Sequence, residues 1–150
     1  MGQDSESTES LAARENEWVR AVLLKPDHPM RDDALDVAED ARAMAMNALG
    51  EHHPAYAEAT QNLGIYYCVH ANDIATAADY FDQARQIVGP YHPILARGFY
   101  FLGLHYRDVG NKDNAREFFT EVLNIIRREG HPEDPRIDQV TQLLTSLEAN

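Results

Sequence analysis

The chain has 150 residues, 44% of them apolar, and a formal net charge of −12. A chain of this length holds one domain with a continuous core. Its acidic charge is spread along the chain and argues against binding to nucleic acid or to an anionic membrane, since both favour basic surfaces. No apolar run approaches the roughly 20 residues of a membrane-spanning helix.

The first nine residues are acidic and polar, and they lack the basic and apolar regions of a secretion signal. We therefore expect a disordered acidic tail over residues 1–9 and a cytoplasmic protein. Cys68 is the only cysteine. A single cysteine excludes an internal disulfide and a cysteine-based zinc site.

From residue 10 onward the apolar residues follow helical spacing, with no convincing strand alternation. The first two predicted helices cover about residues 10–24 and 31–48. The apolar stripe of the first consists of Leu11, Trp18 and Val22, with Val19 and Leu23 beside it. The face expected to pack in the second carries Ala34, Ala38, Ala41 and Met44.

Prolines and glycines separate five further predicted helices. They cover about residues 54–70, 73–88, 93–109 and 112–129, and a last helix that begins after Asp134. Asp134 and Pro135 form a good N-cap and first-turn pair. The last helix has one apolar side and a polar side formed by Asp138, Gln139, Gln142 and Glu148. A helix with one solvent-exposed polar face suits the end of a repeat stack. We therefore predict three helical hairpins followed by a C-terminal capping helix.

A short phrase recurs at a fixed interval along the chain. The pairs His53-Pro54, His92-Pro93 and His131-Pro132 lie 39 residues apart, and the segment 63–67 returns as 102–106 at the same distance. A period of this length is typical of stacked-repeat proteins, in which each unit covers its apolar face with its neighbours. The proline starts a helix, and we expect the histidine to bond or pack at the turn.

The repeated hairpins resemble the tetratricopeptide repeat. The last full hairpin carries the pattern of that family at Phe99, Leu102, Gly103, Tyr106, Ala115 and Phe119. The preceding one carries it at Thr60, Leu63, Gly64, Tyr67, Ala77 and Phe81, with Thr60 in the place of the aromatic. The glycines should let two helices approach closely. The resemblance covers about residues 30–147 and implies an all-α helical-hairpin repeat solenoid.

The linkers point to a subtype of this family. The phrases at 49–54 and 61–64 look like the Leu-Gly-x-x-His-Pro and Asn-Asn-Leu-Ala phrases of kinesin light chain repeats. The first hairpin is degenerate, since its first helix has no Leu-Gly phrase. We predict a single domain over residues 10–150.

The resemblance implies that the first helices of successive hairpins line a concave groove. Its predicted partner-binding residues, at positions not used by the repeated core, are Glu58, Gln61, Asn62, Ile65, Arg97, Tyr100, Leu104 and Arg107. Cys68 falls on the same stripe. Tyr and Arg are enriched in binding hot spots, which supports this assignment. In the alternative interpretation, Tyr100 is partly in the core and the two arginines are solvated or paired locally.

We therefore predict a non-enzymatic adaptor that binds a peptide segment or partner protein in this groove. One alternative is a self-associating subunit, a homodimer formed through the first hairpin or the terminal helix with Trp18 buried. Another is a regulatory subunit of a separately encoded enzyme. We expect no cofactor, no metal site and no catalytic residue, since no HExxH-type spacing and no Gly-rich phosphate loop is present.

Overall fold

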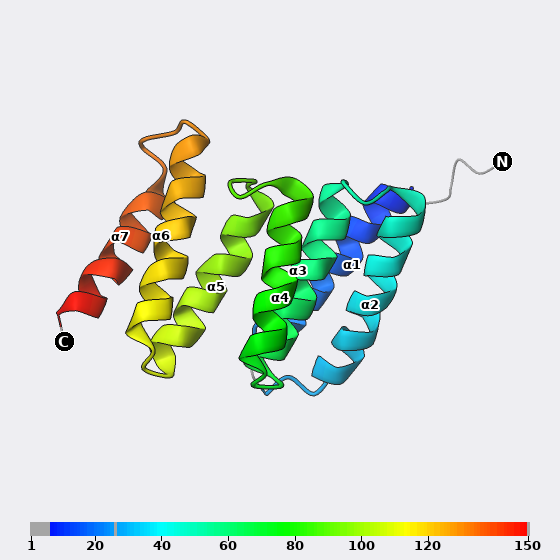
Figure 1. Ribbon diagram of the computed structural model, residues 1–150, viewed down its shortest axis with the longest axis horizontal. Coiled ribbons are helices and arrows are strands. Elements are labelled where there is room, and N and C mark those ends of the chain that lie inside the picture. The colour runs from blue at the N-terminus through cyan, green and yellow to red at the C-terminus, as the bar shows by residue number, and fades with distance from the viewer. Residues whose placement is uncertain (1–6, 26, 150) are drawn as a thin grey trace. The chain divides into compact units, whose positions relative to one another are not determined.

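The computed structural model describes residues 7–25 and 27–149, which form seven helices and no strand (Figure 1). The helices are α1 (Thr8–Leu23), α2 (Arg31–Ala48), α3 (Pro54–Val69), α4 (Ile74–Val88), α5 (Ile94–Asp108), α6 (Lys112–Arg128) and α7 (Pro135–Glu148). They pair as three hairpins followed by one helix. The predicted all-α helical-hairpin repeat fold is therefore confirmed. None of the described helices has the length and apolar character needed to cross a membrane.

The chain divides into two compact units, Met1–Gly89 and Pro90–Asn150. The first holds α1 to α4 and the second holds α5 to α7. Because each hairpin of a repeat protein contacts only its neighbours, such a division also arises within one stack. The single domain expected over residues 10–150 stays a prediction.

Helix α1 begins earlier than the sequence suggested. Thr8 and Glu9, expected in the disordered tail, belong to the first turn of α1. The Ser7 side chain accepts a hydrogen bond from the backbone N–H of Ser10 at 3.1 Å, which satisfies one of the free donors at the helix start. Glu9 adds a favourable negative charge there. Residues 1–6 of the expected tail lie outside the described residues.

The His-Pro pairs share a side-chain hydrogen bond in the turns before helices. Nδ1 of the histidine accepts the backbone N–H two residues later at His53 (from Ala55, 3.0 Å) and at His92 (from Ile94, 3.1 Å). The same bond forms at a further pair, His28-Pro29, from Met30 at 3.1 Å. His53 is the N-cap residue of α3, so its bond caps that helix as a serine or aspartate does elsewhere. The N-cap residues of α2 and α5 make no side-chain cap bond. At the last pair Asp134 takes over, accepting from Arg136 at 2.9 Å. The role expected for the repeated histidines at the turns is confirmed, except at His131.

The first unit has a core of small side chains between α1, α2 and α3. The buried residues of α2 are Ala34, Ala38, Ala41 and Ala45. On α1 the buried side consists of Ala12, Asn16, Val19, Arg20, Val22 and Leu23. Trp18, predicted on the packed stripe, is instead 38% exposed. An alanine face draws two helices close together and leaves too little volume for an indole ring.

Glycines allow close approach of the helices in two of the hairpins. A Cβ added to Gly103 would lie 2.5 Å from Cε1 of Phe119, and one added to Gly64 would overlap the ring of Phe81. Real side chains do not tolerate such contacts, so only glycine fits at both positions. The predicted role of the Leu-Gly phrase is confirmed, and the two hairpins pack by the same contact.

The second unit is built on aromatic contacts between α5 and α6, with α7 packed on α6. The rings of Tyr106 and Phe118 stack with centroids 5.5 Å apart. Val140 and Leu147 of α7 are buried, and its predicted polar side is exposed. Asp134 at the start of α7 pairs with Arg136, and this hydrogen-bonded guanidinium lowers the pKa of the carboxyl to about 2.

Candidate partner-binding surface

The predicted binding residues on α3 do not form an open surface. Asn62 and Ile65 are 0% exposed and Gln61 is 1% exposed, whereas Glu58 is half-buried. A partner has no access to the first three, so their assignment as contact residues is wrong in this arrangement. Cys68 is also 0% exposed, and a reactive cysteine needs solvent access.

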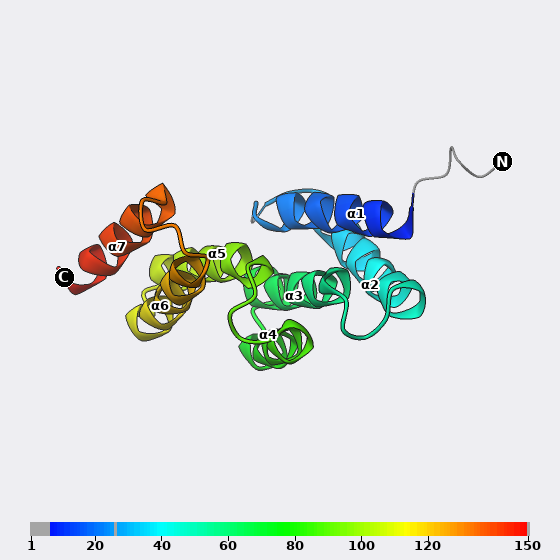
Figure 2. The same ribbon diagram turned by 90° about the horizontal axis from the view of Figure 1, so that it is seen from above.

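Helix α1 lies along this side of α3 (Figure 2). Polar contacts join the two helices, and we call these contacts the polar seam. The side-chain amide of Asn62 donates to the carbonyl oxygen of Asn16 at 3.2 Å. That of Asn16 donates to the carbonyl oxygen of Ala55, also at 3.2 Å. Nε2 of His70 lies 2.8 Å from the carbonyl oxygen of Leu23. These bonds use polar side chains of α1, of α3 and of the residue after α3 for packing inside the unit.

An ion pair completes the polar seam. Nη1 of Arg20 on α1 bonds to Oε2 of Glu58 on α3. The two side chains are 8% and 21% exposed, so water screens the pair only weakly. Sequence reasoning missed this pairing. The sequence feature that indicates it is the spacing of two polar residues, Asn16 and Arg20. They are four residues apart, so they lie on the same, packed face of the first helix.

The predicted residues on α5 lie on an accessible part of the second unit, which we call the α5 surface: Arg97, Tyr100, Leu104 and Arg107. Arg97 is exposed and the other three are half-buried. The four follow one another at helical spacing along a single face. The predicted residues of α3 and those of α5 were expected to line one groove, but the two helices belong to different units. The continuous groove stays a prediction.

Local contacts hold two of these side chains in place. Nε and Nη2 of Arg107 donate to Oδ1 of Asp108 at 3.1 and 2.9 Å. The ring of Tyr100 meets that of Phe101 edge-on at 5.6 Å and lies 6.2 Å from that of Phe119. Part of the geometry therefore agrees with the alternative interpretation of partial packing and local pairing, because Tyr100 packs against two rings and Arg107 pairs with Asp108. Neither contact removes the α5 surface from solvent.

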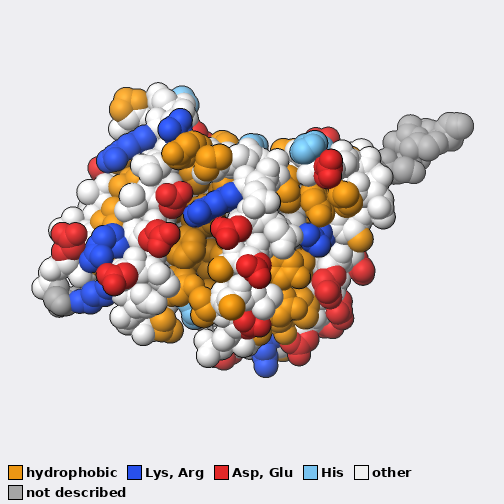
Figure 3. Space-filling view, viewed as in Figure 1, with side chains coloured by type: hydrophobic (Ala, Val, Ile, Leu, Met, Phe, Trp, Pro, Cys, Tyr) orange, Lys and Arg blue, Asp and Glu red, His pale blue; other side chains and the backbone are white. Residues whose placement is uncertain are grey.

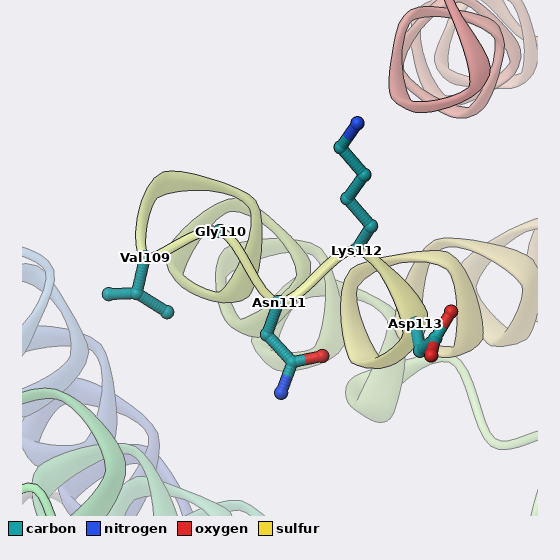
Figure 4. A pocket seen from close by; sticks show the side chains of 5 residues that line it. All are labelled: Val109, Gly110, Asn111, Lys112 and Asp113. Carbon is teal, nitrogen blue, oxygen red and sulfur yellow. The ribbon is translucent and has the colours of Figure 1, made fainter. Parts of the chain in front are cut away.

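The turn between α5 and α6 has an open hollow of about 500 Å³, lined by residues 109–113 (Figure 4). Figure 4 shows the side chains of Val109, Asn111 and Lys112 pointing in different directions. A ligand site needs polar groups that converge on one point, so this hollow is an exposed turn. Among the described residues, no group of three or more His, Cys, Asp or Glu side chains is placed to hold a metal ion.

Comparison with known proteins agrees with the hairpin architecture. A family model for the tetratricopeptide repeat matches residues 31–88, which comprise α2, α3 and α4. No curated protein matches the chain significantly. The chain is thus an all-α protein of helical-hairpin repeats. Residues 31–88 are similar to tetratricopeptide repeats, which are generally protein–protein interaction modules.

Proposed function

We propose that this protein binds a partner protein through the α5 surface and performs no chemistry itself. The observation that carries the proposal is the contrast between the two equivalent stripes. On α3 the predicted residues other than the half-buried Glu58 are buried, whereas on α5 Arg97, Tyr100, Leu104 and Arg107 stay accessible. An interaction module needs an accessible surface, and this one combines residue types that dominate hot spots.

The chemistry of the α5 surface suits a short peptide segment with an acidic and an apolar side chain. Arg97 supplies an exposed positive charge, and Leu104 with the Tyr100 ring supplies apolar area. Because Arg107 is already oriented by Asp108, it loses little side-chain entropy on binding. We also assign the second unit to the tetratricopeptide repeat, of the kinesin light chain subtype. The support is the His-Pro linker and the shared Gly–Phe contact.

Affinity capture with a photocrosslinker tests the α5 surface. A crosslinking residue at position 104 should trap a partner in native lysate, and the change Arg97→Glu/Tyr100→Ala should abolish the adduct. The matched control Gln139→Glu/Gln142→Ala changes the exposed side of α7 and should leave it intact. Equal adducts from both variants, with unchanged circular dichroism, would refute the α5 surface.

Self-association is a second candidate because Trp18 remains on the surface. It is 38% exposed on α1, with the half-buried Leu11 on the same helix. A second copy of the chain covering α1 would bury both side chains. Light scattering compares wild type with Trp18→Ala: a dimer that becomes a monomer supports this candidate, and a wild-type monomer excludes it.

A further inference from the structure

A hollow of about 370 Å³ lies in the first unit where α2, α3 and α4 meet. Its lining includes Arg42 and Met46 of α2, Tyr56 and Leu63 of α3, and Tyr80 of α4. The hollow is on the side of α3 away from the polar seam, since Tyr56 and Leu63 occupy the opposite helical face. In Figure 3, which views this side, hydrophobic side chains gather over α2 and α4.

The guanidinium of Arg42 is fixed in this hollow. It lies 5.1 Å from the ring centroid of Tyr56 and 5.8 Å from that of Tyr80. Nε donates to the hydroxyl of Thr60 and Nη2 to the amide oxygen of Gln83, both at 2.9 Å. Two aromatic rings and two hydrogen bonds therefore hold a cation in one orientation before any ligand arrives.

Arg42 forms no ion pair within the described part of the chain. Both of its hydrogen-bond acceptors are neutral, and Nη1 has no partner among the described residues. Glu39 also lines the hollow, one turn earlier on α2, but forms no ion pair with Arg42. In a chain of net charge −12, an arginine that is held in a hollow and forms no ion pair there can accept a carboxylate from outside.

Two departures from the repeat pattern produce this arrangement. Thr60 stands where the next hairpin carries Phe99, and Gln83 stands where it carries Glu121. A threonine in place of a phenylalanine leaves volume and offers a hydroxyl to the guanidinium. A glutamine in place of a glutamate holds the guanidinium without cancelling its charge.

We propose that this hollow, the Arg42 pocket, binds a peptide segment of a partner protein that presents one acidic side chain beside an apolar one. The carboxylate bonds to Nη1 of Arg42, and the apolar side chain packs against Met46 and Tyr80. The volume suits a few side chains. Because the exposed Glu39 lines the pocket, it disfavours a peptide with a run of acidic residues. The pocket shares no residue with the α5 surface, so it does not depend on that proposal.

Methyl NMR of methionine tests the pocket with a defined probe. The protein carries ¹³C-methyl methionine, and Met46 reports on the pocket while Met30, outside it, serves as the reference. The probes are acetyl-Leu-Glu-Leu-amide and acetyl-Leu-Gln-Leu-amide. We expect the glutamate peptide to shift the Met46 signal in a saturable manner, and the glutamine peptide to bind at least ten-fold more weakly.

A charge placed inside the pocket provides the decisive variant. Gln83→Glu supplies Arg42 with an internal carboxylate and should weaken binding of the glutamate peptide at least ten-fold, with an unchanged fold by circular dichroism. The matched control Gln86→Glu adds the same charge at an exposed position of α4. It should bind the peptide as wild type does.

Several outcomes overturn the proposal. The first is that the glutamate peptide does not shift the Met46 signal, and the second is that both peptides bind equally well. The third is that the Gln83→Glu variant binds the glutamate peptide as tightly as wild type does. Free glutamate that binds as tightly as the peptide would show a small-carboxylate site and overturn the peptide occupant. The variant Arg97→Glu/Tyr100→Ala should bind the peptide normally, so failure here is distinguishable from failure of the α5 surface.

Discussion

The ion pair between Arg20 and Glu58 should contribute strongly to the attachment of α1. Removing one partner of a buried pair costs about 3–5 kcal/mol because the other charge is left uncompensated. Here the remaining side chain is 8% or 21% exposed, and partial hydration reduces the cost. We expect Glu58→Leu and Arg20→Met each to lower the free energy of unfolding by about 2–3 kcal/mol.

The double change Arg20→Met/Glu58→Leu removes both charges together. It should recover much of the loss, since an apolar pair of similar volume replaces a buried ion pair at little cost. The coupling energy from the double-mutant cycle should be about 2 kcal/mol. Urea unfolding measures it. Trp18 is the only tryptophan, so its fluorescence reports on α1 while circular dichroism follows all helices.

An exposed pair on α6 provides the control. Arg116 and Asp113 lie 3.1 Å apart, with side chains 40% and 94% exposed. Their cycle, Arg116→Met with Asp113→Asn, should give a coupling below about 0.5 kcal/mol that salt removes. A coupling for Arg20 and Glu58 as small as this control would refute the role of burial in the polar seam.

Three further predictions follow from local geometry. Gly103→Ala should lower stability by about 1–3 kcal/mol in thermal melts because its methyl group meets the Phe119 ring. His53→Ala should cost about 1 kcal/mol in urea unfolding, and His53→Asn should restore it, because either side chain caps α3. Since Arg136 depresses the pKa of Asp134 to about 2, the stability from this carboxylate is present above about pH 4 and lost as the pH falls toward 2. Acid titration of Asp134→Asn should lack that loss.

Helix positions could be predicted because proline and glycine mark the ends of the helices. The second predicted helix matches α2 at both ends, and the predicted helix over 54–70 ends one residue after α3. The covered side of α3 could not be predicted. Asn16 and Arg20 are polar residues that normally face solvent, and only their pairing with α3 makes burial favourable.

Helical spacing alone predicts that Arg97, Tyr100, Leu104 and Arg107 share one face of α5, because the period determines which residues share a face. The equivalent residues of α3 also share one face, but α1 covers that face. Accessibility depends on what covers a face, and α1 lacks the Leu-Gly phrase that would have aligned it with the other first helices. A repeat pattern therefore predicts which residues share a helical face better than it predicts which element covers that face.

Positions at which the sequence departs from the repeat pattern, such as Thr60, are the ones that we connect with function. A buried phenylalanine at position 60 would add about 2–3 kcal/mol of apolar burial, whereas Thr60 gives a hydroxyl bond to Arg42 and one to the carbonyl of Tyr56. Each such bond contributes about 1 kcal/mol net. The chain thus gains no clear stability from this exchange. What it gains is a fixed, accessible cation, which is the pattern expected where stability is given up for binding.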